Sequence, residues 1–182
     1  MKISSALTKK LKGVRLILSD VDGVLTDGKL YLTEGEEIKV FNAKEALRIE
    51  AAQRSGLKII WITGRKAKAT IRRSKELNVP LIFKQDIAKL KIPALDFLKK
   101  KYRVNLKEIL YIGDDWGDLF LMKRVGVSAT PKNGSPENKT IAHIISSRNG
   151  GDGVVAEIIE MVMRANGTWE KYIKEYLAKY IY

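Results

Sequence analysis

Short apolar runs alternate along this chain with segments of helical periodicity, and this alternation limits the possible folds more than any other feature. The runs at 14–19, 58–63 and 108–112 are almost continuously apolar, as strands buried on both faces of a sheet are. Helix-like segments such as 66–77 separate them. Strands that alternate with helices form a parallel sheet with helices on both faces, so we expect an α/β, Rossmann-like fold. With 182 residues and 45% hydrophobic content, the chain most simply forms one domain spanning residues 1–182.

The remaining elements are predicted from periodicity and from turn residues. Alternating residues on both sides of Glu34-Gly35 predict an antiparallel hairpin, with strands at 29–33 and 37–41, inserted after the first strand. No segment is long enough for a separate cap domain. The pattern also predicts strands at 80–83, 126–129 and 143–146. It predicts helices at 43–54, 87–102 (with a break near Pro93), 119–125 and 154–164. Ser135-Pro136 would begin a further helix, and a C-terminal helical extension is expected at about 168–182.

Composition excludes several classes of function. The chain has no cysteine, which excludes disulfides and thiolate chemistry, and its single histidine gives no support to a zinc site or a Ser-His-Asp hydrolase. The net charge of +13 would suit a nucleic-acid ligand. The basic residues are spread along the whole chain without a recognised binding motif, however, so we expect a solvated surface that attracts anionic substrates and no nucleic-acid partner.

The N-terminal segment lacks the apolar core of a signal peptide. No apolar run approaches the roughly 20 residues that a membrane helix needs. We therefore expect a cytoplasmic protein with no membrane partner.

Three of the expected strands end in clusters of polar residues. These clusters are SDVDG at 19–23, TGR at 63–65 and GDDWGD at 113–118. Because ligands bind beyond the carboxyl ends of the strands in such a sheet, Asp20, Asp22 and Asp114 are expected to be neighbours. Carboxylates that share a site repel one another unless a cation lies among them, and oxygen ligands without His or Cys favour magnesium. The sequence therefore predicts a Mg²⁺ site that holds an anionic ligand.

The same residues suggest a reaction. A carboxylate at a strand tip can attack phosphorus, and Asp20 is placed to do so. Asp22, two residues further along an extended chain, points the same way and can protonate the leaving oxygen and later deprotonate water. Thr63 offers a hydroxyl, and Lys89 a cation, to the phosphoryl oxygens.

The motifs DVDGVLTDG, ITGR, the position of Lys89 and GDDWGD resemble, in order and spacing, the four motifs of the haloacid dehalogenase superfamily of phosphatases. Phe41-Asn42, ITGR, YIGDD and the RNGG-x-G segment at 148–153 extend the resemblance to the capless 3-deoxy-D-manno-octulosonate 8-phosphate phosphatase family. It covers roughly residues 12–167.

The resemblance implies a role for each matching residue. Asp20 would be the nucleophile, Asp22 the acid/base, and Asp20, Asp22 (through its carbonyl) and Asp114 the metal ligands. Asp115 and Asp118 would lie in the outer shell of the metal. Phosphoryl and substrate contacts would come from Thr63, Lys89, Gly64, Arg65, Asn42 and Lys44.

The resemblance also implies an assembly. The family forms homotetramers in which hairpins pack together and a C-terminal tail reaches the neighbouring site, and the stretch 149–153 matches that tail. The substrate would be a small anionic sugar phosphate, and the expected function a magnesium-dependent phosphatase in lipopolysaccharide biosynthesis.

Two departures from the family pattern leave the substrate open. Lys44 stands where the family has Arg and loses its bidentate fork, and Ala156 stands where the tail has Arg. A phosphatase for a nine-carbon, sialic-acid-type sugar 9-phosphate and a non-catalytic oligomerisation module of the same fold are the alternatives.

Overall fold

The computed structural model describes residues 4–35, 37–83 and 93–179. Its main sheet has six parallel strands in the order β5-β4-β1-β6-β7-β8. Their bounds are Leu16–Asp20 (β1), Lys58–Thr63 (β4), Leu81–Phe83 (β5), Ile109–Ile112 (β6), Val127–Thr130 (β7) and Ile144–Ile145 (β8). The chain builds outward from β1 through β4 to β5 and then returns to place β6 on the other side of β1. The order of the strands therefore reverses at β1 and β6, which is where α/β sheets form ligand sites.

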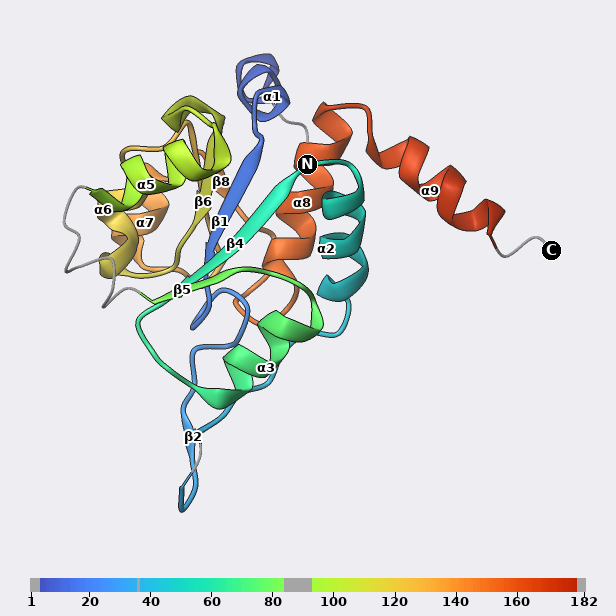
Figure 1. The fold of residues 1–182 in the computed structure, drawn as a ribbon. Coiled ribbons are helices and arrows are strands. Elements are labelled where there is room, and N and C mark those ends of the chain that lie inside the picture. The colour runs from blue at the N-terminus through green and yellow to red at the C-terminus, as the bar shows by residue number, and fades with distance from the viewer. Residues whose placement is uncertain (1–3, 36, 84–92, 180–182) are drawn as a thin grey trace.

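Helices cover both faces of this sheet (Figure 1). One face carries α1 (Ser5–Lys12), α2 (Glu45–Arg54) and α8 (Val154–Ala165), and the other carries α5 (Pro93–Tyr102), α6 (Leu119–Met122) and α7 (Pro136–Ile141). Successive residues of β1 point to opposite faces, so that Ile17 enters the first core and Leu16 and Leu18 enter the second. This two-sided burial explains why the central strands read as continuous apolar runs.

The remaining helices lie at the ends of the sheet. These are α3 (Lys68–Glu76) after β4, the short 3₁₀ turns η1 (Leu106–Glu108) and η2 (Trp116–Asp118) on either side of β6, and the C-terminal α9 (Trp169–Ala178). Trp169 is buried against α8, while most of α9 extends away from the body (Figure 1). Within the described ranges no helix is both long and apolar enough to cross a membrane.

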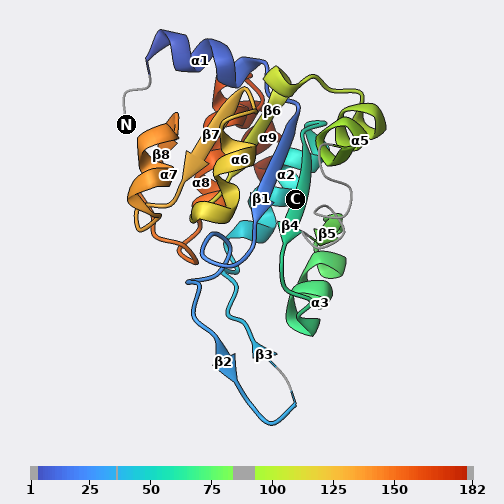
Figure 2. The ribbon, with the colours of Figure 1, turned by 90° about the vertical axis from the view of Figure 1, so that its left-hand side faces the viewer.

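An antiparallel hairpin, β2 (Tyr31–Leu32) and β3 (Glu37–Ile38), projects past the carboxyl ends of the sheet strands (Figure 2). Its outer surface is unusually apolar. The exposed large apolar residues are Leu30, Tyr31, Leu32, Ile38 and Val40.

The predicted fold class is confirmed, with small differences at element ends. The hairpin strands are only two residues each instead of five, because beyond Tyr31–Ile38 and Leu32–Glu37 no further pairs form in the described hairpin. Ser135 caps α7 as expected, accepting a hydrogen bond from the Asn138 amide at 3.2 Å, with Pro136 as its first residue. Thr168 precedes α9, but its hydroxyl donates to the Met163 carbonyl instead of capping that helix. The predicted break near Pro93 borders 84–92, outside the described residues.

Candidate active site

Three carboxylates meet where β1 and β6 end. In the parallel register Ser19 lies opposite Ile112, which brings Asp20 and the segment after β6 to the same edge of the sheet. Asp20, Asp114 and Asp118 each offer an oxygen within 4.8 Å of the other two. Asp20 and Asp118 are buried, and Asp114 is half-buried. The expected meeting of Asp20 with Asp114 is therefore present, and Asp118 joins them.

The donor set fits a hard divalent cation. Three carboxylates this close and this buried repel one another in water-poor surroundings, and a cation between them relieves that repulsion. All three donors are oxygens, with neither His nor Cys, which suits Mg²⁺. The side chains of Asp20, Asp114 and Asp118 surround the position that it would take, so Asp118, predicted for the outer shell, lies in the same cluster as the predicted ligands Asp20 and Asp114.

Asp118 is held in place by three hydrogen bonds. The Tyr111 hydroxyl donates to its Oδ1 at 2.7 Å, and the amides of Asp114 and Asp115 donate to its Oδ2 at 3.0 and 3.4 Å. Burial raises the pKa of Tyr111 well above its ordinary value, and the charges of Asp118 and Asp20 raise it further, so the phenol stays protonated and donates. Asp118 makes no side-chain bond that caps α6. Asp115 is exposed and caps η2 through the Trp116 amide.

The side chain of Asp22 faces Lys39 and Thr63 and is not among the three clustered carboxylates. Its Oδ1 forms an ion pair with the Lys39 ammonium, and its Oδ2 accepts from the Thr63 hydroxyl at 3.5 Å. Thr63 also accepts a hydrogen bond from the Arg65 amide at 3.1 Å. The bond between Thr63 and Asp22 joins the end of β4 to the loop that follows β1. The structure thus brings together the predicted acid/base and phosphoryl-binding residues. Their roles stay predictions, and Lys89 lies outside the described residues.

Lys39 is a site residue that the sequence reasoning missed. Its side chain is only 1% exposed, and its ammonium lies 3.0 Å from a carboxylate oxygen of Glu37 as well as against Asp22. Arg65 completes this chain of charges from the other side, 3.4 Å from Glu37. A signal was present in the alternation of the hairpin, because Glu37 and Lys39 point inward while Ile38 and Val40 are exposed.

The charge of Glu37 is kept by its two basic neighbours. Partial burial acts to raise the pKa of this carboxyl, but the hydrogen bond and charge of Lys39, with the charge of Arg65, outweigh it and leave the pKa below its ordinary value. Glu37 therefore remains an anion that connects Arg65 to Lys39. Arg65, predicted to contact the substrate, is accordingly held by the hairpin.

Glycines bring two loops into direct contact at the site. Gly23, in the β1 loop (residues 21–28), has φ +90, and a Cβ there would lie 2.0 Å from Asp114 Oδ2. Gly150, in the α8 loop (residues 146–153), is packed so closely that a Cβ would lie 1.9 Å from the Gly23 carbonyl oxygen. The Gly151 amide donates to the Val24 carbonyl at 3.0 Å. Within this chain these glycines pack on the chain's own β1 loop, and the expectation that 149–153 serves a neighbouring subunit stays a prediction.

The start of α2 is joined to the same α8 loop. Asn42 donates from Nδ2 to the Gly151 carbonyl at 3.3 Å, and Glu45 Oε1 accepts from the Val155 amide at 3.2 Å. Burial raises the pKa of Glu45 to about 8. Glu45 was not singled out in the sequence; a lone Glu in a helical segment carries no signal of burial. Lys44, a predicted substrate contact, lines a groove together with Ala156. None of the clustered carboxylates lines that groove.

Comparison with known proteins agrees with this geometry. Residues 82–158 match the family model of haloacid dehalogenase-like hydrolases. The 3-deoxy-D-manno-octulosonate 8-phosphate phosphatase KdsC of Escherichia coli K12 is 32% identical over 166 residues, which cover 91% of this chain and 87% of KdsC.

Solved structures extend the similarity to the whole fold. The phosphatase of this name from Moraxella catarrhalis, solved with a magnesium ion, a phosphate ion and KDO, is 34% identical with a TM-score of 0.86, covering 94% of this chain and 98% of that one. The cobalt-bound enzyme of Haemophilus influenzae is 28% identical with a TM-score of 0.80, covering 88% and 93%. The carboxylate cluster at β1 and β6, the inserted hairpin and these matches together place the chain in the 3-deoxy-D-manno-octulosonate 8-phosphate phosphatase family of haloacid dehalogenase-like hydrolases.

Proposed function

We propose that the chain is a magnesium-dependent phosphomonoesterase that hydrolyses 3-deoxy-D-manno-octulosonate 8-phosphate, a step of lipopolysaccharide biosynthesis. The observation that carries this proposal is the meeting of Asp20, Asp114 and Asp118 beside Asp22 and Thr63, within a chain whose relatives act on that substrate. Magnesium bound by the cluster would neutralise the carboxylates and the phosphoryl oxygens, and so allow an anion to approach.

The chain's own residues carry the bond changes. A carboxylate oxygen of Asp20 attacks phosphorus while the bond from phosphorus to the sugar oxygen breaks, and the protonated form of Asp22 gives its proton to the leaving oxygen. Water then attacks the phosphorus of the aspartyl phosphate, and Asp22 takes the proton of that water. Inorganic phosphate leaves and the Asp20 carboxylate is restored. Thr63 and the backbone at Gly64 face the transferred group.

The preferred sugar is the finer part of the proposal. Relatives of 32% identity support an eight-carbon acidic sugar, whereas Lys44 and Ala156 depart from the family pattern on the substrate side. A nine-carbon sugar acid 9-phosphate is therefore the competing substrate.

We also propose that the chain is a single domain that works as a homotetramer in the cytoplasm. The apolar outer surface of the hairpin supports association, since Leu32 is 73% and Val40 is 64% exposed. Without a cap domain among the described residues, a neighbouring subunit is the simplest cover for the site. The absence of cysteine suits a reducing compartment.

The test is phosphate release with Mg²⁺ across a panel of sugar phosphates, run with the wild-type chain and Asp20→Asn. Turnover is expected to be highest with the eight-carbon acid and to fall at least about 10⁴-fold in the variant, because the nucleophile is lost. Asp96→Asn, which removes an exposed carboxylate of α5 outside the cluster, serves as the control. Equal turnover in wild type and Asp20→Asn would refute the aspartyl-phosphate chemistry. If the wild type released no phosphate from any substrate, the non-catalytic module would be favoured.

A further inference from the structure

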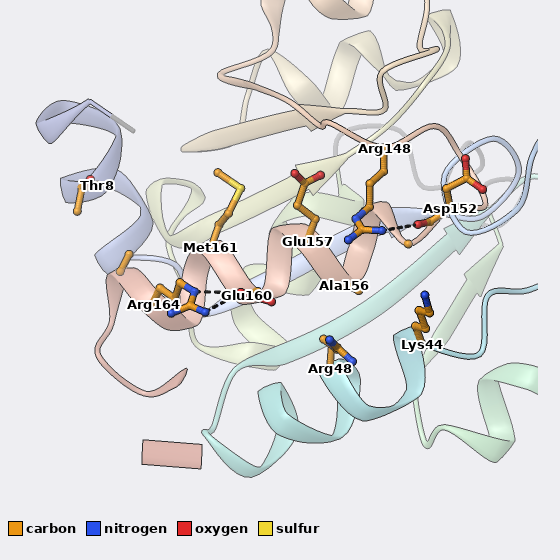
Figure 3. Close-up of a pocket in the computed structure, with 12 residues that line it drawn as sticks. Thr8, Lys44, Arg48, Arg148, Asp152, Ala156, Glu157, Glu160, Met161 and Arg164 are labelled. Atoms are coloured by element: carbon orange, nitrogen blue, oxygen red, sulfur yellow. Dashed lines mark hydrogen bonds and ion pairs between the residues drawn. The ribbon is translucent and has the colours of Figure 1, made fainter. Parts of the chain in front are cut away.

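A groove with a volume of about 500 Å³ lies between α2 and α8, with α1 at one end (Figure 3). Its wall includes the apolar side chains of Ala156 and Met161, and its size is that of sites for small organic ligands. None of the three clustered carboxylates lines it. The groove is therefore separate from the carboxylate cluster, although its lining includes Lys44, which the sequence predicted as a substrate contact.

Three cations border the end of the groove nearest the α8 loop. Lys44 and Arg48 project from the start of α2, and Arg148 from the α8 loop (Figure 3). Within the described ranges, none of the three forms an ion pair with a carboxylate. Arg148 donates only to the Asp152 backbone carbonyl, at 3.2 Å.

The acidic residues of the groove are engaged elsewhere. Glu157 accepts from the Ser147 hydroxyl at 2.7 Å and from Ser146, and Glu160 is paired with Arg164 at 2.8 Å. The Asp152 carboxylate is turned away from the Arg148 guanidinium (Figure 3). The lining as a whole has four basic side chains (Lys44, Arg48, Arg148 and Arg164) and three acidic ones (Asp152, Glu157 and Glu160), so the groove keeps a net positive charge beside an apolar wall.

We propose that this groove is a second binding site, for a small organic or inorganic oxyanion held by Arg48 and Arg148. Two guanidinium groups can each offer paired N–H donors to a carboxylate or a phosphate, and Lys44 adds a point charge. The space beside Ala156 and Met161 accommodates the body of a small sugar acid, while the cations alone would hold free phosphate. Both ligands share the chemistry that the groove recognises.

The position of the groove gives its occupant a route to the active site. The α8 loop supplies Arg148 to the groove, and through Gly150 and Gly151 it packs on the β1 loop that follows Asp20. An anion that holds Arg148 toward α2 would therefore also hold the loop on which the β1 loop rests.

Calorimetric titration of the full chain tests the proposal. The protein is freed of metal by chelation and of chelator by gel filtration, so that the negative carboxylate cluster disfavours anions at the active site. Inorganic phosphate and 3-deoxy-D-manno-octulosonate are titrated separately at low salt. We expect saturable binding of at least one of them, and the difference between the two titrations identifies the source of the anion.

The variant that decides the matter is Arg48→Gln/Arg148→Gln. Binding is expected to weaken at least about tenfold, since a charge-assisted hydrogen bond is lost at each position. Arg54→Gln/Arg124→Gln removes the same net charge from exposed positions outside the groove and is expected to bind as the wild type does. No binding of either anion by the wild type, or equal binding by the groove variant, would overturn the proposal. No turnover is measured, so the outcome is independent of the proposed phosphatase function.

Discussion

At the scale of single residues, Lys39 is the side chain that links the hairpin to the chemistry. Its buried ammonium touches Asp22 and Glu37, so it is placed to orient the proposed acid/base. Lys39→Met is expected to lower kcat by about 10- to 100-fold with a smaller change in KM, because Asp22 loses the partner that sets its position.

Steady-state kinetics of the variant measures this split between kcat and KM. Lys29→Met, which removes an exposed lysine of the same hairpin region, is the matched control and should keep wild-type rates. Unchanged kcat in Lys39→Met would show that Asp22 is positioned without it.

Asp118 is the second residue for which a single substitution is informative. Its carboxylate adds the third negative charge to the cluster, and Tyr111 and two amides hold it there. Asp118→Asn is expected to weaken Mg²⁺ binding by about 10- to 100-fold, because a charge in the metal's surroundings is lost. Calorimetric Mg²⁺ titration measures the change, with the exposed Asp96→Asn as control. Wild-type Mg²⁺ affinity in Asp118→Asn would exclude Asp118 from the metal site.

At the scale of elements, the contact of α2 with α8 depends on a buried carboxyl group. Glu45 is 2% exposed, and burial raises its pKa from the ordinary 4.5 to about 8. The folded protein therefore holds this proton more tightly than the unfolded chain. Binding of this proton contributes its full share to the free energy of unfolding below about pH 4.5. That contribution is lost as the pH rises to about 8, and above that pH it does not change further.

Glu45→Gln keeps an acceptor for the Val155 amide but has no proton to lose. Urea unfolding at pH 5, 7 and 9 is expected to show the variant gaining stability relative to the wild type as the pH rises. Glu50→Gln, in the same helix and paired with Arg54 at the surface, should follow the wild type. A difference between Glu45→Gln and wild type that does not vary with pH would mean that Glu45 is ionised throughout.

At the scale of the whole molecule, the hairpin has exposed apolar side chains that the packing of a single chain leaves uncovered. It projects past the sheet (Figure 2). Its apolar side chains, among them Leu32 and Val40, are exposed, whereas Lys39 is buried against Asp22. Leu32→Ser/Val40→Ser is expected to convert the proposed tetramer into smaller species, because the apolar contact area between subunits is lost.

Light scattering coupled to size-exclusion chromatography measures the mass of each species. Phe97→Ser, at an exposed apolar position on α5, is the control and should leave the mass unchanged. A wild-type mass of one chain would remove the tetramer and with it the cover that we propose for the site.

Much of this molecule followed from the sequence alone, because local patterns determined it. Continuous apolar runs predicted β1, β4 and β6 as two-sided strands. Polar residues at their ends predicted that Asp20, Asp22 and Asp114 would meet, and the side chains of Asp20 and Asp114 do so, whereas that of Asp22 pairs with Lys39. These inferences hold because the carboxyl ends of parallel strands always share one edge.

Only the tertiary structure decided which side chains from segments far apart in the chain come into contact or line one groove. A lysine at position 39 and a glutamate at position 45 look like ordinary surface residues until the hairpin folds back on the site and α2 packs on α8. The groove with Arg48 and Arg148 has the same origin, since its two sides come from segments about one hundred residues apart. Burial and the pairing of charges depend on all neighbours in space, whereas a sequence pattern records only neighbours along the chain.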